Sequence, residues 1–210
     1  MEPIYLSYYL EENTPLYGGI RNLISIKQNS SIDNGNTSND LIISFPNHSG
    51  THIDFPYHFC NKGKKCSDYP APFWIFNKIG FLDCSIEEVP EGICHLSKDI
   101  ELLILKTGFG EMRGDEIFWK AQPVIPANFA ALFRATFPNL RVFGFDLISL
   151  TSKLNRTEGK NAHSSFLIEN DILVIEDMNL SRLTCTPDNV IVSPLQIGIA
   201  DGVPCTIISY

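Results

Sequence analysis

Three histidines and one aspartate lie within a single stretch of eleven residues, His48, His52, Asp54 and His58, in a chain that has five histidines in total. Imidazole nitrogens and carboxylate oxygens bind zinc, manganese or iron. No pair of cysteines stands nearby, so the pattern favours an open, catalytic metal site over a closed structural zinc site. The alternative is a capping aspartate with solvent-facing histidines, and that does not require three histidines so close together.

The same stretch contains Gly50 and Pro56, which disfavour a helix. In an extended chain positions 48, 52, 54 and 58 have the same parity, so their side chains point to one side. Ten residue steps would still separate the first and last histidine by roughly 33 Å, whereas metal–ligand distances are about 2 Å. We therefore predict that the chain folds back at Gly50 and Pro56.

The elements that must position these residues are short and apolar. Runs of β-branched, Leu or Phe residues typical of buried or half-buried strands are Leu41–Phe45, Ile79–Cys84, Leu102–Lys106, Arg141–Phe145, Ile172–Ile175, Val190–Val192 and Thr206–Ile208. Apolar residues at helical spacing from Phe129 to Phe137 predict a helix that Pro138 ends. A shorter helical turn is predicted over Ala162–Ile168, with Asn161 as its cap. The pattern indicates a mixed α/β domain.

Two segments are predicted to be irregular. Residues 28–40 are almost wholly Asn, Ser, Asp, Gly and Thr, which is typical of a mobile loop or a functional flap. Thr107–Gly110 contains two glycines after a strand but lacks the third glycine of a dinucleotide site, so we interpret it as a turn. Specificity loops are expected at Gln28–Asp40 and Asp68–Phe76.

Composition limits the classes of partner. The chain has 210 residues, 44% hydrophobic residues and a net charge of −8, which disfavours nucleic acid because the basic group Lys62, Lys64 and Lys65 is too short to overcome it. The apolar run Ile4–Leu10 lacks a basic lead, so neither a signal peptide nor a membrane span is expected. Six scattered cysteines without a CxxC pair predict reduced thiols and a cytoplasmic protein.

The segment His48-x-Gly-Thr-His52-x-Asp54-x-Pro56-x-His58-Phe59 resembles the HxGTHxDxPxHF signature of the cyclase-like metal hydrolases, which include bacterial kynurenine formamidase and isatin hydrolase. The resemblance spans the chain, so residues 1–210 are expected to form one domain. Further matches are Thr14–Leu16, Leu103–Gly108, Gly144–Asp146 with Ser149, Ala162–His163, Ile175–Leu180 and Asp201–Pro204. The fold that the resemblance implies is a single α/β domain with a mixed, barrel-like sheet flanked by helices, of the swivelling β/β/α type, assembled as a homodimer or homotetramer.

The resemblance also implies roles for single residues. His48, His52 and Asp54 are expected to hold a first metal ion, and Asp54 is expected to bridge to a second ion held by His163 and Glu176. His58 is expected to be the catalytic acid/base, with a further ligand or a partner of a ligand as its alternative. The ion is expected to be Zn²⁺, one or two per subunit, with Mn²⁺ as the alternative.

The chain departs from the family pattern at two places. Glu176 follows His163 by thirteen positions, one more than the family leads us to expect, so Glu169 and Asp177 are alternative ligands. Tyr17-Gly-Gly-Ile20 stands where formamidases tend to have Trp-Pro-Gly-Asp, so Tyr17 is expected to supply the aromatic wall of the substrate site.

The implied activity is hydrolysis of a small non-peptide amide by metal-activated hydroxide, with an aryl formamide as substrate and a cyclic amide or lactone as the alternative. Two rival hypotheses remain open at this stage. His52, Asp54 and His163 also match the two-His, one-carboxylate triad of non-haem iron oxygenases, and the same fold can serve a metal-binding protein without activity. Asp146 and Ser149 are interpreted either as pocket residues or as strand-end caps.

Overall fold

One large mixed sheet organises the molecule. The computed structural model describes residues 2–210, and nine of its strands form a sheet in the order β5-β10-β11-β4-β9-β8-β7-β6, with β1 paired to β11. These strands are β1 (Ile4–Tyr5), β4 (His52–Asp54), β5 (Ile75–Phe76), β6 (Ile79–Asp83), β7 (Leu102–Lys106), β8 (Val142–Phe145), β9 (Leu173–Glu176), β10 (Val190–Pro194) and β11 (Gly202–Ser209). β6, β7, β8 and β9 are parallel to one another, and the remaining pairs are antiparallel.

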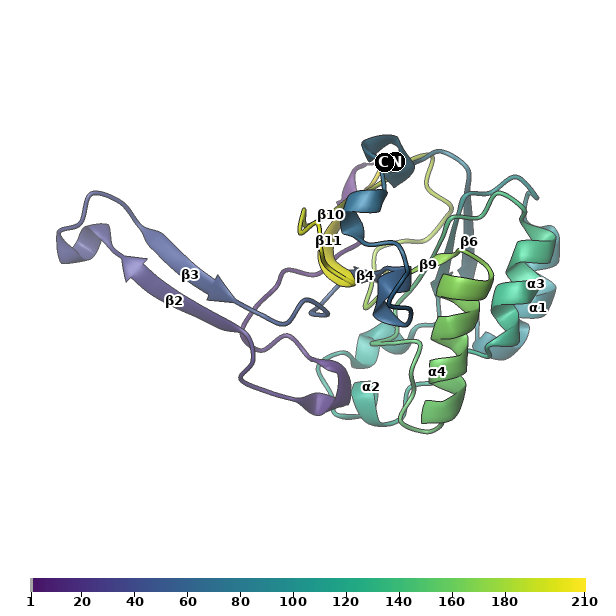
Figure 1. The fold of residues 1–210 in the computed structure, drawn as a ribbon, viewed down its shortest axis with the longest axis horizontal. Coiled ribbons are helices and arrows are strands. Elements are labelled where there is room, and N and C mark those ends of the chain that lie inside the picture. Colours follow the sequence, from purple (N-terminus) through teal and green to yellow (C-terminus); the bar gives the residue numbers. More distant parts are fainter. Residues whose placement is uncertain (1) are drawn as a thin grey trace.

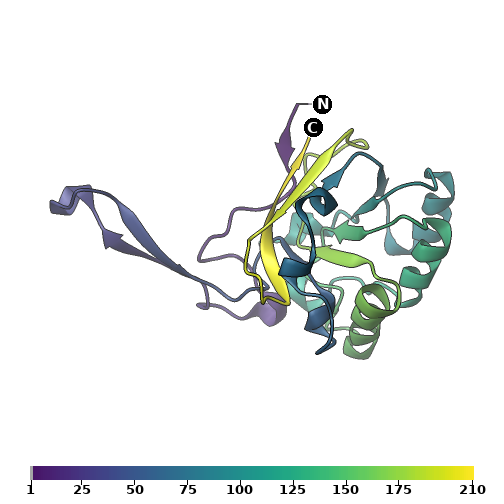
Figure 2. The ribbon, with the colours of Figure 1, turned by 45° about the horizontal axis from the view of Figure 1, so that its top comes forward.

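Strand β11 joins the two parts of this sheet. Its first residues pair with β4, and its last residues pair with β10 on one side and β1 on the other. The sheet therefore curls into a nearly closed, barrel-like form, and the two ends of the chain lie side by side because Ile4 pairs with Ser209 (Figure 2). This arrangement encloses β4, the strand that carries the central part of the histidine-rich segment.

The helices are α1 (Val89–Gly92), α2 (Ile117–Lys120), α3 (Asn128–Thr136) and α4 (Arg156–Ser164). Helices α1, α3 and α4 lie on the side of the parallel strands, whereas α2 lies apart from them and contacts the turn at Tyr17–Gly19 (Figure 1). Phe133 of α3 packs edge-on against Phe143 of β8 with ring centroids 5.1 Å apart, and Phe166, just after α4, stacks on Phe143 at 5.3 Å. Burial of these aromatic side chains fixes α4 relative to the sheet, which matters because α4 delivers His163 to the site.

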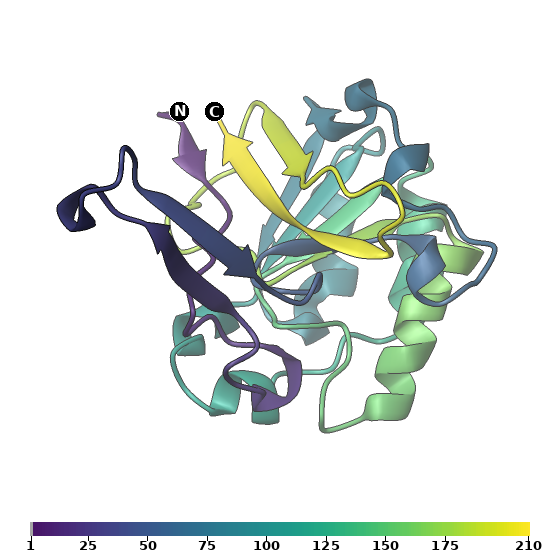
Figure 3. The same cartoon turned by 60° about the vertical axis from the view of Figure 1, so that its left-hand side comes forward.

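A two-stranded hairpin projects from this body (Figures 1 and 3). It consists of β2 (Ser25–Ser30) and β3 (Asp40–Ser44), joined by a tip that includes a short turn at Ile32–Asn34. All five residues of β3 are exposed. The prediction of a buried or half-buried strand is therefore wrong about burial for residues 41–44. The segment 28–40, predicted as an irregular loop, lies mainly in the irregular tip of this hairpin, between the strand ends at Ser30 and Asp40.

The fold class predicted from the sequence is confirmed: a mixed α/β domain with a barrel-like sheet flanked by helices. The predicted strand at 102–106 coincides with β7, and the helix predicted near 129–137 is α3. The predicted cap Asn161 is wrong, because α4 begins before it and Asn155 accepts the hydrogen bond from the Glu158 amide. A wider helical turn, Ser165–Glu169, continues α4. Within residues 2–210 no helix is long and apolar enough to cross a membrane.

Candidate metal centre

Strand β4 places His52 and Asp54 on one face of the sheet, since they are two residues apart in an extended chain. The register puts His52 directly opposite Glu176 of β9 and Asp54 directly opposite Gly202 of β11. Side chains at directly opposed positions of an antiparallel pair lie on the same face. The imidazole of His52 and the carboxylates of Asp54 and Glu176 therefore lie close together on one face of the sheet, and all three are buried.

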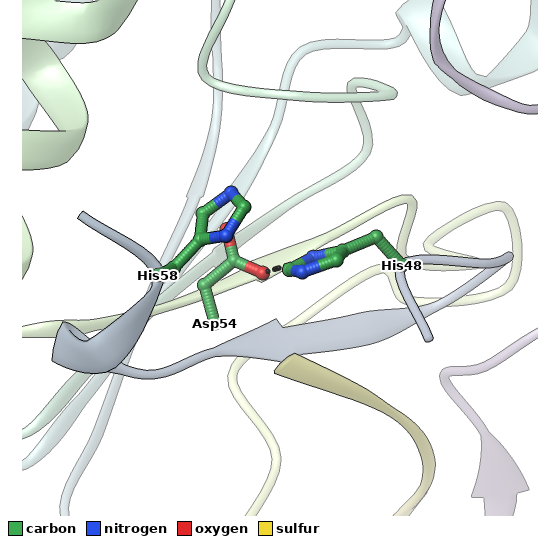
Figure 4. A group of neighbouring side chains, drawn as sticks. All are labelled: His48, Asp54 and His58. Carbon is green, nitrogen blue, oxygen red and sulfur yellow. Dashed lines mark ion pairs between the residues drawn. The ribbon is translucent and has the colours of Figure 1, made fainter. Parts of the chain in front are cut away.

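The chain folds back on both sides of β4, as the sequence predicts. Gly50 adopts a positive φ of 60°, and Pro56 opens a 3₁₀ turn that ends at His58. The rings of His48 and His58 consequently lie 4.2 Å apart rather than at opposite ends of an extended segment. Figure 4 shows both imidazoles beside the carboxylate of Asp54.

Helix α4 contributes His163 from the opposite side. Its Nδ1 lies 2.8 Å from the carbonyl of Gly159, one turn earlier in the helix, and the Nδ1 of His52 lies 2.8 Å from the carbonyl of Gly50. A carbonyl only accepts hydrogen bonds, so both Nδ1 atoms donate, and in each ring Nε2 is the atom that faces the carboxylates. Histidines that bind metals are commonly held by a hydrogen bond of this kind.

The donor atoms are spaced as ligands of a shared ion would be. His52 Nε2 lies 3.5 Å from Asp54 Oδ1 and 3.4 Å from Glu176 Oε2. His163 Nε2 lies 3.6 Å from Asp54 Oδ2 and 3.3 Å from Glu176 Oε1. Ligand atoms about 2.1 Å from a tetrahedral ion are about 3.4 Å from one another. In each of these two carboxylates, one oxygen thus faces His52 and the other faces His163.

One buried oxygen in this cluster is left without a donor. His48 Nδ1 is 2.9 Å from Asp54 Oδ1, but the two groups are not oriented for a hydrogen bond. Asp54 Oδ1 therefore has no hydrogen-bond partner among the described residues. An uncompensated buried carboxylate oxygen is costly. A divalent cation bound by Asp54 and the surrounding imidazoles would remove that cost, so the residues fit a metal ion.

The charges of the cluster are strongly coupled. Burial alone lowers the pKa of His52, but Glu176 and Asp54 outweigh it and raise that pKa to about 9. Burial also lowers the pKa of His163, but Asp54 and Glu176 outweigh it and raise that pKa to about 10. Burial raises the pKa of Asp54, whereas the contacts with His163 and His48 hold it well below its usual range. The carboxylates are therefore ionised at neutral pH and attract cations.

The centre lies at one wall of a cavity of about 280 Å³. Pro15, Tyr17, Phe59 and Ile148 give the cavity an apolar lining beside the cluster. His58 and His48 are the more accessible members, with side chains 29% and 23% exposed, whereas those of His52 and His163 are 7% and 4% exposed. His58 can therefore meet a small molecule that enters the cavity.

The family of the chain follows from a match over most of its length. The model of the family described as "Putative cyclase" matches residues 4–151. The chain belongs to the cyclase family. The kynurenine formamidase of Bacillus mycoides strain KBAB4 is 30% identical over 162 residues, covering 75% of this chain and 73% of that protein. The kynurenine formamidase of Bacillus cereus strain ATCC 14579 is 29% identical over 162 residues, which again cover 75% of this chain and 73% of that protein.

Solved structures show the same cyclase-family fold. Isatin hydrolase A from Labrenzia aggregata, bound to benzyl benzoate, aligns with a TM-score of 0.82 at 19% identity, covering 99% of this chain and 93% of that one. A predicted metal-dependent hydrolase from Bacillus stearothermophilus aligns with a TM-score of 0.76 at 15% identity, covering 99% of this chain and 97% of that one. At these identities the likeness concerns the fold.

The structure separates the alternative ligands that the sequence leaves open. Glu176 lies beside His163 and His52, whereas Glu169 is exposed at the end of the helical turn that follows α4. Asp177 is directed elsewhere: both of its oxygens accept 2.8 Å hydrogen bonds from Arg113. Burial raises the pKa of Asp177 even though Arg113 opposes the shift. Neither alternative joins the cluster.

Other predicted site residues take different places. Asp146 is a strand-end cap: its carboxylate accepts hydrogen bonds from Thr107 and from the backbone amides of Gly108 and Gly110, which also confirms the turn predicted there. Ser149 lines the cavity and donates to Glu176 Oε1 at 3.1 Å. Tyr17 lines the cavity, and its role as the aromatic wall of a substrate site stays a prediction. None of the described residues in 28–40 or 68–76 lines this cavity, and the role of these segments in specificity stays a prediction.

Sequence reasoning missed two polar residues near the centre. Asp201 contacts both His58 and His48, and Arg113 holds Asp177 while its guanidinium lies 3.8 Å from the centre of the Tyr8 ring. The Asp-Gly-Val-Pro run that begins at Asp201 is part of the family resemblance and was the available signal for it. The contact of Arg113 with Asp177 could not be predicted, because the two residues are 64 positions apart and no motif links them.

Gly202 sets the space available to His48. A Cβ at this position would come within 2.3 Å of His48 Cε1 and 3.0 Å of Asp54 Oδ1. We expect Gly202→Ala to displace His48 and to weaken metal binding roughly 10- to 100-fold, the usual effect of disturbing the surroundings of a ligand. Titration with Zn²⁺ by calorimetry measures the change.

Gly198→Ala is the matched control for this variant. Gly198 lies four residues before Gly202, in the loop that leads into β11, and an added Cβ there meets only ordinary contacts at 3.5 Å and beyond. Unchanged zinc affinity in Gly202→Ala would show that His48 does not bind the ion.

Proposed function

We propose that the protein is a metal-dependent hydrolase that cleaves the C–N bond of a small non-peptide amide, with an aryl formamide as substrate. The observation that carries the proposal is the cluster around Asp54, where buried imidazole and carboxylate donors 3.3–3.6 Å apart surround an oxygen that lacks a hydrogen-bond donor. The relatedness to kynurenine formamidases supports the choice of substrate.

In this proposal the ligands are His48, His52, Asp54, His163 and Glu176. Asp54 would be shared if two ions bind, since its Oδ1 lies near His48 and His52 and its Oδ2 lies near His163. Glu176 faces both His52 and His163 in the same way. Nitrogen and oxygen donors without thiolates suit Zn²⁺ best, and Mn²⁺ remains the alternative to be tested. Five donors exceed the three of an iron oxygenase triad.

A bound divalent cation supplies an acidified water molecule and polarises a carbonyl group. The chain itself must then move a proton from the attacking water to the leaving nitrogen, since an amine leaves poorly without one. His58 is placed for this proton transfer because it borders the cavity and because its Nδ1 is occupied by Asp201 at 2.7 Å. Its other nitrogen, Nε2, is the one that would exchange the proton.

The cavity favours a flat, apolar substrate. A volume of about 280 Å³ lies just under the usual range of about 300–1,000 Å³ for ligand pockets, which suits a single substituted ring. The hydroxyl of Tyr17 is buried and has no hydrogen-bond partner among the described residues. In the proposed complex this hydroxyl donates to a polar group of the substrate, while the ring of Tyr17 covers its aromatic face.

Hydrolysis of a substrate panel tests the proposal. N-formylkynurenine, isatin and simple lactones would be compared side by side with the Zn²⁺-loaded, the Mn²⁺-loaded and the chelator-treated protein. We expect metal-dependent turnover that is fastest on the formamide and independent of oxygen. Fastest turnover of isatin or a lactone would assign the protein to cyclic substrates, and oxygen consumption would instead indicate an oxygenase. Metal binding without turnover of any compound would indicate a binding protein.

We also propose that the protein is a cytoplasmic homodimer. All six cysteines are free, consistent with a reducing compartment. The β2–β3 hairpin supports the dimer: the register places Leu41 and Ile43 on one face with Ile26, and an isolated two-stranded hairpin is marginally stable in water. Leu41 and Ile43 are 49% and 53% exposed. A second copy of the chain would cover this face.

Replacing Leu41 and Ile43 together by Ser should convert the dimer to a monomer, because it removes the apolar face without touching the body of the protein. Light scattering coupled to size-exclusion chromatography measures the change. Lys27→Ser on the opposite face is the control and should remain dimeric. A dimer that persists in the double variant would place the interface elsewhere.

A further inference from the structure

Asp201 lies at the point where the chain enters β11, and a single oxygen of its carboxylate contacts two histidines. Its Oδ2 is 2.7 Å from His58 Nδ1 and 3.1 Å from His48 Nε2. These histidines flank β4 on its two sides, one before Gly50 and one after Pro56. Asp201 therefore connects two groups that have different roles in the proposed function.

The carboxylate of Asp201 is itself held in place. Its other oxygen, Oδ1, accepts a 2.6 Å hydrogen bond from the side-chain amide of Asn47, which also donates to the Gly202 carbonyl at 3.1 Å. The backbone carbonyl of Asp201 accepts a hydrogen bond from the Phe55 amide at 2.8 Å. The β4–β11 pairing continues from this point with Gly202 opposite Asp54. Asp201 is thus fixed to the strand that carries the metal ligands.

The contacts determine where the imidazole protons lie. An ionised carboxylate only accepts hydrogen bonds, so His58 donates from Nδ1 and His48 donates from Nε2. His58 then presents the lone pair of Nε2 toward the reaction. His48 presents the lone pair of Nδ1 toward Asp54 Oδ1, 2.9 Å away. This explains why His48 faces the cluster through Nδ1, whereas His52 and His163 face it through Nε2.

We propose that Asp201 is a positioning residue that fixes the tautomer and orientation of His58 and His48 at once. The consequence for catalysis rests on the proposed function, but the tautomer assignment does not. Without Asp201, His58 could carry its proton on either nitrogen and could rotate away from the cavity. A single carboxylate would then ensure that proton transfer and metal binding use complementary nitrogens of the two rings.

Asp201→Asn tests the proposal because it keeps the shape and inverts the hydrogen bonding. Asn47 donates to Oδ1, so the retained oxygen of the new amide should face Asn47, and the new NH₂ group should face both imidazoles. A donor facing His58 Nδ1 favours the tautomer with its proton on Nε2. We expect kcat to fall by roughly 10²- to 10⁴-fold at saturating Zn²⁺, the range for a mispositioned proton-transfer group.

Two measurements separate positioning from a general structural effect. The first is a long-range ¹⁵N–¹H spectrum of the neutral imidazoles in the Zn²⁺-loaded protein, in which the His58 signal is assigned because it is absent from His58→Ala. The proton of His58 should lie on Nδ1 in the wild type and on Nε2 in Asp201→Asn. In the His58→Ala background at saturating Zn²⁺, Asp201→Asn should cause no further loss of kcat, because the proton-transfer group is already absent, while its effect on His48 should be measured separately as weaker zinc binding. Asp188→Asn, an exposed site, removes the same charge and should change neither result.

Several outcomes would overturn the proposal. One is the same His58 tautomer in wild type and Asp201→Asn; another is a full additional loss of kcat in the double variant. If Asp201→Asn does not fold, Asn47→Ala removes the anchor instead and should give His58 mixed tautomers, with an unchanged spectrum counting against the proposal. An inactive wild-type protein with the expected tautomers would refute the proposed function while leaving the role of Asp201 intact.

Discussion

His58→Ala should keep its metal and lose turnover. The imidazole borders the cavity, is 29% exposed and contacts Asp201, so its removal takes away the group that we propose to exchange protons with the substrate. A positioned acid/base is worth about 10² to 10⁴ in rate, so kcat should fall by that range while KM changes much less. Steady-state kinetics with N-formylkynurenine, together with elemental analysis of the purified variant, measures both quantities.

This experiment also decides the alternative role of His58. A nitrogen of His58 lies with donor atoms of His48 and Asp54 inside a group that is tight enough to hold an ion. Loss of metal from His58→Ala would therefore make His58 a ligand, and another group would have to move the proton. Near-normal kcat would mean that no side-chain acid/base is needed. His95→Ala is the control, because His95 is exposed and lies outside the cavity lining.

Asp54→Asn should abolish both metal binding and activity. The substitution keeps the size of the side chain but removes the charge that faces His48, His52 and His163. Loss of one ligand weakens metal binding, and in the proposed centre Asp54 is the ligand with the most imidazole neighbours. We expect less than about a tenth of the wild-type metal content, measured by elemental analysis after dialysis, and no detectable turnover.

The fold of this variant must be checked separately. Far-ultraviolet circular dichroism of chelator-treated wild type and Asp54→Asn should coincide if the loss is local. Asp188→Asn controls for the change in net charge, since Asp188 is exposed. Full metal content in a folded Asp54→Asn protein would rule out the proposed centre.

Features that depend on neighbours along the chain are predictable from the amino-acid sequence. The segment from His48 to His58 is one of them, because Gly50 and Pro56 dictate where it turns and because alternate residues of a short strand share a face. The strand β7 and the helix α3 are predictable from their own composition and from the spacing of their apolar residues. The types of ligand available to a metal also follow from the residues of the motif.

Long-range strand pairing determines which distant residues complete the centre and which apolar run is exposed. Asp201 meets His58 across 143 residues of sequence, and Glu176 rather than Glu169 joins the cluster only because β9 pairs with β4 in the observed register. Leu41–Ile43 has the pattern of a buried strand, yet it lies on a projecting hairpin. Local patterns report which side chains share a face, whereas strand pairing determines what that face meets.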